Sequence, residues 1–259
     1  MEFLPAAFCA YNCPMPRTAP ATALAPPPAG SAHLGPLVVV LVAYAGLMGV
    51  SFSQAAYGLL LNSDRLAAQD GLRREMFYDT LVFEAVDAVI VAAALILAAR
   101  PLRRAAAWSR LGTWLLSVPG FAAVIGVNFA YHALLVYLFA GDDPPEAAGA
   151  DGAADGLFTR DGWRTVLTVC VQPAVVEELF FRFLLLGHLR HHLGLHASVW
   201  LSSVLFGMAH LGNVPGWPVL IGIGVTLGYA RVLSGGMALP ILLHFCHNFV
   251  ICLAEEFGH

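Results

Sequence analysis

The chain has 259 residues, of which 59% are apolar and 12% are charged, and its mean hydropathy is +0.73. This composition excludes a soluble globular domain, because too few polar side chains are available to cover its surface. The formal net charge of -4 carries no information about partners, and we expect no nucleic acid among them. The sequence therefore predicts an integral, multi-pass membrane protein.

The first segment, residues 1–35, is a tail rich in Pro and Ala that includes three consecutive prolines from Pro26 to Pro28. It cannot bury enough apolar surface to fold, so we expect it to be disordered. The stretch from Met1 to Pro16 lacks the basic and apolar regions of a secretory signal peptide. The first apolar span is therefore expected to be retained.

Apolar runs follow along the chain, and a run of about 20 residues crosses about 30 Å of hydrocarbon as a helix. We predict about seven spans, with six or eight as the alternatives. They lie at about 36–61, 80–99, 112–140, 164–187, 197–212, 217–234 and 237–254. The third run contains Pro119 and Gly120, so it is expected to be tilted, kinked or divided in two. The predicted fold class is an all-α, multi-pass transmembrane helical bundle.

A loop dominated by Gly, Ala, Asp and Pro separates two groups of helices. Its composition suits a flexible aqueous connection. We therefore predict an N-terminal group of transmembrane helices at 36–140, a flexible acidic loop at 141–162 and a functional core at 163–254.

Three charged residues interrupt the fourth apolar run: Glu177 and Glu178 are adjacent, and Arg182 follows them. A charged side chain at membrane depth costs about 2.5 to 3.5 kcal/mol on insertion scales, so these groups need partners. Residues four apart share a helical face, so Glu178 is expected to pair with Arg182, whereas Glu177 is rotated by about 100°. We expect Glu178 to stay ionised beside Arg182 and Glu177 to accept a proton. The alternative is a buried ion-pair cluster that only fixes helix packing.

Two further polar patterns follow in later runs. His210 ends the sequence Phe206-Gly-Met-Ala-His210, and a single His at a helix end is more often structural than catalytic. His244 and Asn248 are four apart, so their imidazole and carboxamide can point at the same atom. Such a pair can donate two hydrogen bonds to an oxygen that becomes negative during acyl transfer. His247 is a candidate supporting partner of this pair. An H-x-x-H metal site and a purely structural role remain alternatives.

Two acids in the second run, Glu84 and Asp87, share a helical face. They could serve as an ion site, a packing element or the wall of a wet cavity. The alternative function is therefore a non-catalytic membrane scaffold or immunity protein, or an ion- or proton-coupled transporter. No inverted repeat relates the two halves, which makes a transporter the weaker alternative.

Three motifs occur in order on successive predicted helices, namely Glu177-Glu178-x-x-x-Arg182, Phe206-x-x-x-His210 and His244-x-x-x-Asn248. Together they resemble the CPBP family, also called Abi, which contains CAAX prenyl proteases and bacteriocin-processing enzymes. The resemblance covers about 163–254, the size of that family's core domain. It implies an all-helical membrane core and intramembrane proteolysis of a membrane-associated or prenylated, CAAX-like substrate.

The resemblance also implies a role for each motif residue. Glu177 and His210 would activate the attacking water, and His244 and Asn248 would stabilise the oxyanion. Peptide hydrolysis needs an activated water, oxyanion donors and a proton for the leaving amine, and this set can supply all three. Glu178 and Arg182 would support the helix that carries Glu177.

Cofactor use divides the family, which has been described both as metalloprotease and as glutamic-type protease. Glu177, His210 and His244 would make a zinc set with an open water position, yet the same residues can act as a general base without metal. Because no H-E-x-x-H helix places metal ligands in advance, we favour a reaction without a cofactor.

The expected location is the bacterial inner membrane, since a lysine-free composition rich in Ala and Arg is associated with high-GC bacterial genomes. The expected partners are the lipid bilayer and a membrane-associated peptide or protein substrate.

Overall fold

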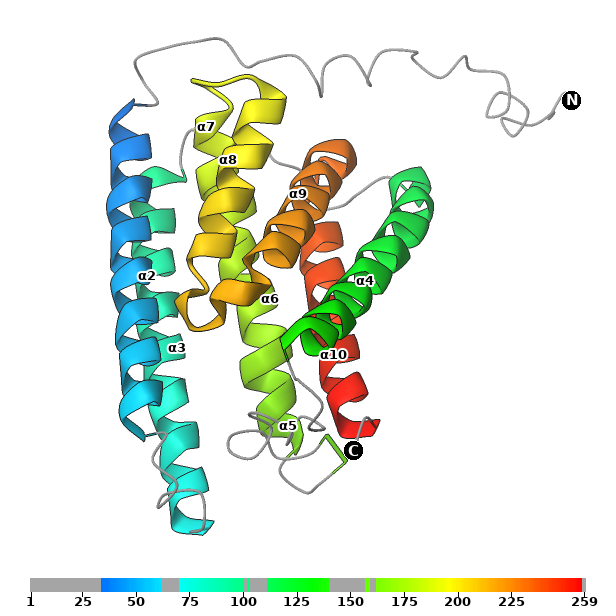
Figure 1. Ribbon diagram of the computed structural model, residues 1–259. Coiled ribbons are helices and arrows are strands. Elements are labelled where there is room, and N and C mark those ends of the chain that lie inside the picture. The colour runs from blue at the N-terminus through cyan, green and yellow to red at the C-terminus, as the bar shows by residue number, and fades with distance from the viewer. Residues whose placement is uncertain are drawn as a thin grey trace, which may run out of the picture.

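The computed structural model describes residues 34–61, 70–99, 102, 111–139, 157–158 and 162–257. The tail predicted at 1–35 and the loop predicted at 141–162 lie almost entirely outside the described residues. The described chain is an all-α helical bundle, which confirms the predicted fold class (Figure 1).

Seven helical rods follow one another in the described part of the chain, close to the seven predicted runs. They are α2 (Leu34–Leu61), α3 (Asp70–Ala98), α4 (Leu111–Phe139), a composite helix over residues 162–189, α8 (Leu195–Met208), α9 (Trp217–Ser234) and α10 (Ala238–Phe257). A 3₁₀ segment, η5 (Leu211–Gly216), joins α8 to α9.

Within the described residues, five segments are long and apolar enough to cross a bilayer. They are Leu34–Ala56, Thr80–Ala98, Ser117–Leu138, Leu211–Ser234 and Ala238–Phe257. Their outward faces carry exposed large apolar side chains such as Val42, Ile96 and Leu138, as lipid contact requires. The chain is therefore an integral membrane protein. The 14-residue helix α8 would be about 21 Å long, shorter than the hydrocarbon layer.

Two of the three N-terminal helices, α2 and α3, pack against the composite helix. α2 and α3 pack side by side, whereas α4 is inclined to them and packs against α9 and α10 (Figure 1). α4 continues through Pro119 as one helix, so the alternative in which this run divides in two is wrong. Hydrogen bonds tie these helices to the core. Among them, the Tyr44 hydroxyl donates to the Leu205 carbonyl at 3.0 Å, and the Tyr131 hydroxyl donates to the Pro215 carbonyl at 2.8 Å.

The composite helix alternates between ordinary α turns and wider π turns. Its parts are α5 (Gly162–Thr165), the π segment η3 (Val166–Val171), α6 (Gln172–Glu177), the π segment η4 (Glu178–Leu185) and α7 (Leu186–Leu189). Pro173 lies in the first turn of α6 and has no N–H, so it cannot donate the α-helical bond to the carbonyl of Val169. That carbonyl is therefore left to another donor. Glu177 ends α6, and Glu178 begins η4.

The central core packs around η4. Phe180, Phe181, Leu184 and Leu185 are almost completely buried against apolar side chains of α2, α3 and α8. This packing fixes the orientation of the helix on which Glu177 and Glu178 lie.

α8 and α9 approach each other closely because of glycines. A Cβ atom at Gly224 would lie 2.9 Å from the Cβ of Ser203, and one at Gly228 would lie 3.0 Å from a side-chain carbon of Val199. Small residues permit such close approach of helix backbones in membranes. The close packing holds the end of α8, beyond which His210 lies.

Candidate active site

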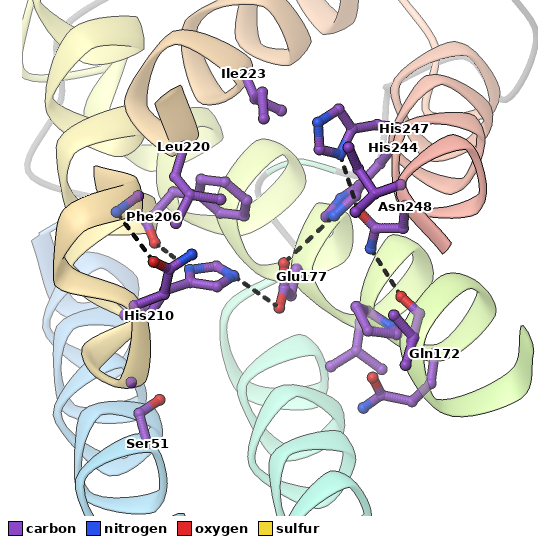
Figure 2. A pocket seen from close by; sticks show the side chains of 18 of the residues that line it. Ser51, Gln172, Glu177, Phe206, His210, Leu220, Ile223, His244, His247 and Asn248 are labelled. Carbon is purple, nitrogen blue, oxygen red and sulfur yellow. Dashed lines mark hydrogen bonds and ion pairs between the residues drawn. The ribbon is translucent and has the colours of Figure 1, made fainter. Parts of the chain in front are cut away.

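Glu177 is the centre of a cluster made by all three motifs. Its Oε1 lies 3.8 Å from Nε2 of His210, and its Oε2 lies 3.7 Å from Nε2 of His244. Figure 2 shows the carboxylate between the two rings, with His210 on one side and His244 on the other. The Glu177 side chain is 26% exposed, so it is reachable from the cavity that it lines.

His210 follows the end of α8 and has its ring oriented by the backbone. Its Nδ1–H donates to the carbonyl of Phe206 at 2.9 Å, since a carbonyl can only accept. A neutral ring therefore has its lone pair on Nε2, the nitrogen that faces Glu177. The carbonyl of His210 accepts a hydrogen bond from the Trp217 indole at 3.0 Å, which helps to fix this turn.

His244 is oriented by the second carboxylate of the pair. Its Nδ1–H donates to Oε1 of Glu178 at 2.9 Å, and its Nε2 faces Glu177. The spacing within α10 does not reveal this bond, because 66 residues separate His244 from Glu178. The two adjacent glutamates thus contact the two nitrogens of one imidazole.

Glu178 also forms the predicted ion pair with Arg182. The Arg182 Nη1 lies 3.1 Å from the Glu178 Oε1, and the residues are 2% and 0% exposed, respectively. The Arg182 guanidinium also lies over the ring of Phe206, 4.3 Å from its centroid. Phe206 further contacts the rings of His210 and His244, so it fills the space between the ion pair and the two histidines.

Asn248 lies one turn beyond His244 on α10 and lines the same cavity. Its Nδ2 donates to the carbonyl of Val169 at 2.8 Å, the carbonyl that Pro173 leaves without its α-helical donor (Figure 2). Its Oδ1 lies 3.1 Å from Nδ1 of His247. The amide is therefore held from two sides, and one Nδ2 hydrogen is not used by Val169.

The cavity has a volume of about 1020 Å³ and is bounded by both groups of helices. The N-terminal helices contribute Ser51 from α2, Glu84 and Asp87 from α3, and Asn128 and His132 from α4. The two acids of the second run therefore face the same space as the Glu177 carboxylate. This arrangement agrees with the cavity-wall alternative for them.

The helices that carry this site are similar to those of a known protein family. Residues 159–250 match the model of the family described as type II CAAX prenyl endopeptidase, Rce1-like. This part of the chain is similar to the CAAX protease family. The resemblance inferred from the three motifs is thus confirmed. No curated protein and no solved structure matches the chain.

The match to this family and the long apolar helices support a membrane protease at the coarse level. The matched residues include Glu177, Glu178, Arg182, His210, His244 and Asn248. The match names neither the bond that is cleaved nor the mechanism.

The zinc set considered for this site consists of Glu177, His210 and His244. Its chemistry suits zinc, and Oε2 of Glu177 is buried without a hydrogen-bond partner among the described residues. The oxygen–nitrogen separations of 3.7 and 3.8 Å are wider than the roughly 3.3 Å between two ligands each about 2.0 Å from a tetrahedral ion. In the described part of the chain, no three such side chains are close enough together to hold an ion. As arranged, Glu177 lies farther from both imidazoles than a tetrahedral zinc ion requires.

Two contacts in this site were not predicted from the sequence. Glu178 was expected only to pair with Arg182, and its contact with His244 depends on the tertiary fold. Asn128 is a polar residue in the apolar helix α4, and it contacts His247 at 3.1 Å. A signal for Asn128 existed, because an amide in an otherwise apolar membrane helix needs a partner.

Proposed function

We propose that the chain is an intramembrane endopeptidase that hydrolyses a peptide bond of a membrane-associated or prenylated, CAAX-like substrate. The observation that supports this most is the Glu177 carboxylate, which faces Nε2 of both His210 and His244 within a cavity that both groups of helices line. A carboxylate and an imidazole lone pair at this separation can hold a water molecule between them.

In the first step, Glu177 and His210 activate this water. The Phe206 carbonyl keeps the Nδ1 proton of His210 in place, so Nε2 can accept a hydrogen bond from the water. Glu177 accepts the proton as the water oxygen attacks the scissile carbonyl. A positioned general base of this kind contributes about 10²- to 10⁴-fold to the rate.

In the second step, His244 and Asn248 stabilise the oxyanion. His244 acts with protons on both nitrogens: Nδ1–H is held by Glu178, and Nε2–H is donated toward the negative oxygen. The Nδ2 hydrogen of Asn248 that Val169 does not use is the second donor. The proton on Glu177 then passes to the leaving amine, which completes the hydrolysis.

The reaction is proposed to need no cofactor, because the carboxylate and the imidazoles supply every proton transfer. The alternative is a zinc enzyme with Glu177, His210 and His244 as ligands. Removal of metal from the protein distinguishes the cofactor-free reaction from the zinc enzyme.

The proposed location is the bacterial inner membrane, with the bilayer and a membrane-associated substrate as partners. A transporter is the second candidate, because Glu84 and Asp87 line the same cavity as Glu177. A chain of carboxylates along a cavity can serve as a proton or ion path.

A peptidase assay in proteoliposomes tests the proposed function. The wild-type chain and Glu177→Gln are reconstituted with a farnesylated peptide that ends in a CAAX sequence and with the same peptide without the lipid. We expect wild type to release a C-terminal fragment from at least one peptide, and Glu177→Gln to release none. Equal cleavage by both proteins would refute the proposal, and a Glu177-dependent proton flux without cleavage would favour the transporter.

A further inference from the structure

Asn128 and His247 form a buried polar contact between two membrane helices. Asn128 lies on α4 and is 4% exposed, and His247 lies on α10 and is 6% exposed. Their Nδ2 and Nε2 atoms are 3.1 Å apart. Polar side chains buried in a membrane bundle are costly unless they are hydrogen-bonded, so this pair needs a structural or functional reason.

The contact continues through Asn248 to the backbone of the composite helix. Nδ1 of His247 lies 3.1 Å from Oδ1 of Asn248, and Nδ2 of Asn248 lies 2.8 Å from the carbonyl oxygen of Val169. Four groups from three separate segments thus form one chain of hydrogen bonds. The chain begins on α4, passes through α10 and ends on η3.

The direction of every hydrogen bond in this series follows from the last group, the Val169 carbonyl. The Val169 carbonyl can only accept, so Asn248 must turn its NH₂ group toward it and its Oδ1 toward His247. That oxygen accepts, so Nδ1 of His247 must donate, and in the neutral ring Nε2 is then an acceptor. Asn128 satisfies that acceptor by donating from Nδ2.

We infer that Asn128 and His247 are positioning residues that fix the amide orientation of Asn248. The inference rests on the proposed function, in which Asn248 donates to the oxyanion. If the amide rotated by half a turn, Oδ1 would take the place of Nδ2 and would repel a negative oxygen. Because the protons are ordered along these hydrogen bonds, the rotated amide would place two acceptors against each other at Val169 and two donors against each other at His247.

These hydrogen bonds connect α4 to the site. α4 precedes the residues matched to the family model, 159–250, and lies in the N-terminal group of helices. Asn128 is the residue through which this helix holds the amide of Asn248. The matched core is therefore incomplete without α4 in this chain.

The first test is the protonation of the His247 ring, measured by ¹⁵N NMR of histidine-labelled protein in nanodiscs. The His247 signals are assigned by their absence from the spectrum of His247→Phe. We expect a neutral ring with the proton on Nδ1 in wild type. In Asn128→Leu we expect the ¹⁵N signal of Nε2 to shift, because Nε2 loses its hydrogen-bond donor. A proton on Nε2 in wild type, or an unchanged Nε2 signal in Asn128→Leu, would overturn the inference. This measurement does not depend on peptide cleavage, so it tests the hydrogen bonds from Asn128 to Val169 even if the proposed function fails.

The second test is kinetic and uses Asn128→Leu and His247→Phe in proteoliposomes. Each should lower kcat by about 10- to 100-fold with KM unchanged, as loss of an orienting partner does. His247→Gln retains one donor and one acceptor and should recover part of the loss. In an Asn248→Ala background, neither substitution should lower kcat further, since both act through Asn248.

A general loss of structure would give a different pattern. It would lower kcat in the Asn248→Ala background as well, and this additive result would overturn the inference. His196→Phe is the matched control, because His196 is bonded to Tyr229 and does not line the cavity. Its kcat should equal that of wild type.

Discussion

Nδ1 of His244 lies 2.9 Å from Oε1 of Glu178, and this contact joins α10 to the centre of the composite helix. The same oxygen of Glu178 lies 3.1 Å from the Arg182 guanidinium. One carboxylate therefore offsets a buried cation and orients the imidazole that faces Glu177. For this reason the two neighbouring glutamates are not interchangeable: Glu177 faces the cavity, while Glu178 is completely buried.

Arg182→Met is expected to destabilise the fold, because it leaves the buried Glu178 carboxylate without its cation. Breaking a buried ion pair by removing one partner costs about 3–5 kcal/mol. The free energy of unfolding in mixed micelles measures this loss. Arg182→Lys is the control: it keeps the charge but gives up the planar contact over Phe206, so its loss should be smaller. Equal stability of Arg182→Met and wild type would show that the pair contributes nothing.

His210→Phe is expected to lower kcat by about 100-fold, because Phe cannot accept the hydrogen bond that places the attacking water beside Glu177. The effect should fall on kcat rather than KM, since His210 faces Glu177 and acts on the water. Peptide cleavage in proteoliposomes measures both constants. The same substitution at the exposed His192 should leave them unchanged. A fall of less than tenfold in His210→Phe would exclude this role of His210 in placing the water.

Gly224→Ala is expected to destabilise the contact between α8 and α9. Its Cβ would lie 2.9 Å from the Cβ and 3.1 Å from the Cα of Ser203, so the backbones would have to move apart. Overpacking of this kind costs about 1–3 kcal/mol. Gly222→Ala is the matched control two residues away, because nothing lies within 4 Å of a Cβ there. The thermal midpoint should fall for Gly224→Ala alone. An equal fall for both would contradict the packing explanation, because helix propensity favours Ala over Gly at either position.

The sequence was sufficient for the helices and the motifs, because both depend on local spacing. Apolar runs predicted the helical rods, and the four-residue spacing predicted the ion pair of Glu178 and Arg182. The contacts of Glu178 with His244 and of Asn128 with His247 join residues 66 and 119 positions apart. No periodicity encodes such contacts, since they depend on how the helices pack. The π turns around α6 could not be predicted from the sequence either, although Pro173 marked where the hydrogen-bond pattern must change.

Metal removal is expected to leave the activity unchanged. The three candidate ligands lie farther apart than a tetrahedral zinc ion requires, and the proposed proton transfers use only side chains. Activity after exhaustive chelation and zinc content by elemental analysis are the two measurements. Retained cleavage without stoichiometric zinc supports the glutamic-type reaction. Loss of cleavage that zinc alone restores would contradict it.

Glu177 carries the central claim, and the C-termini of membrane proteins test that claim most directly in cells. Mass spectrometry compares the C-termini in membranes from cells that express the wild-type chain, Glu177→Gln or Glu256→Gln. Glu256 is the matched control because it bonds to the backbone of Leu157 and does not line the cavity. The account predicts a set of new C-termini with the wild-type chain and with Glu256→Gln that is missing with Glu177→Gln. An identical set of C-termini in all three membranes would contradict it.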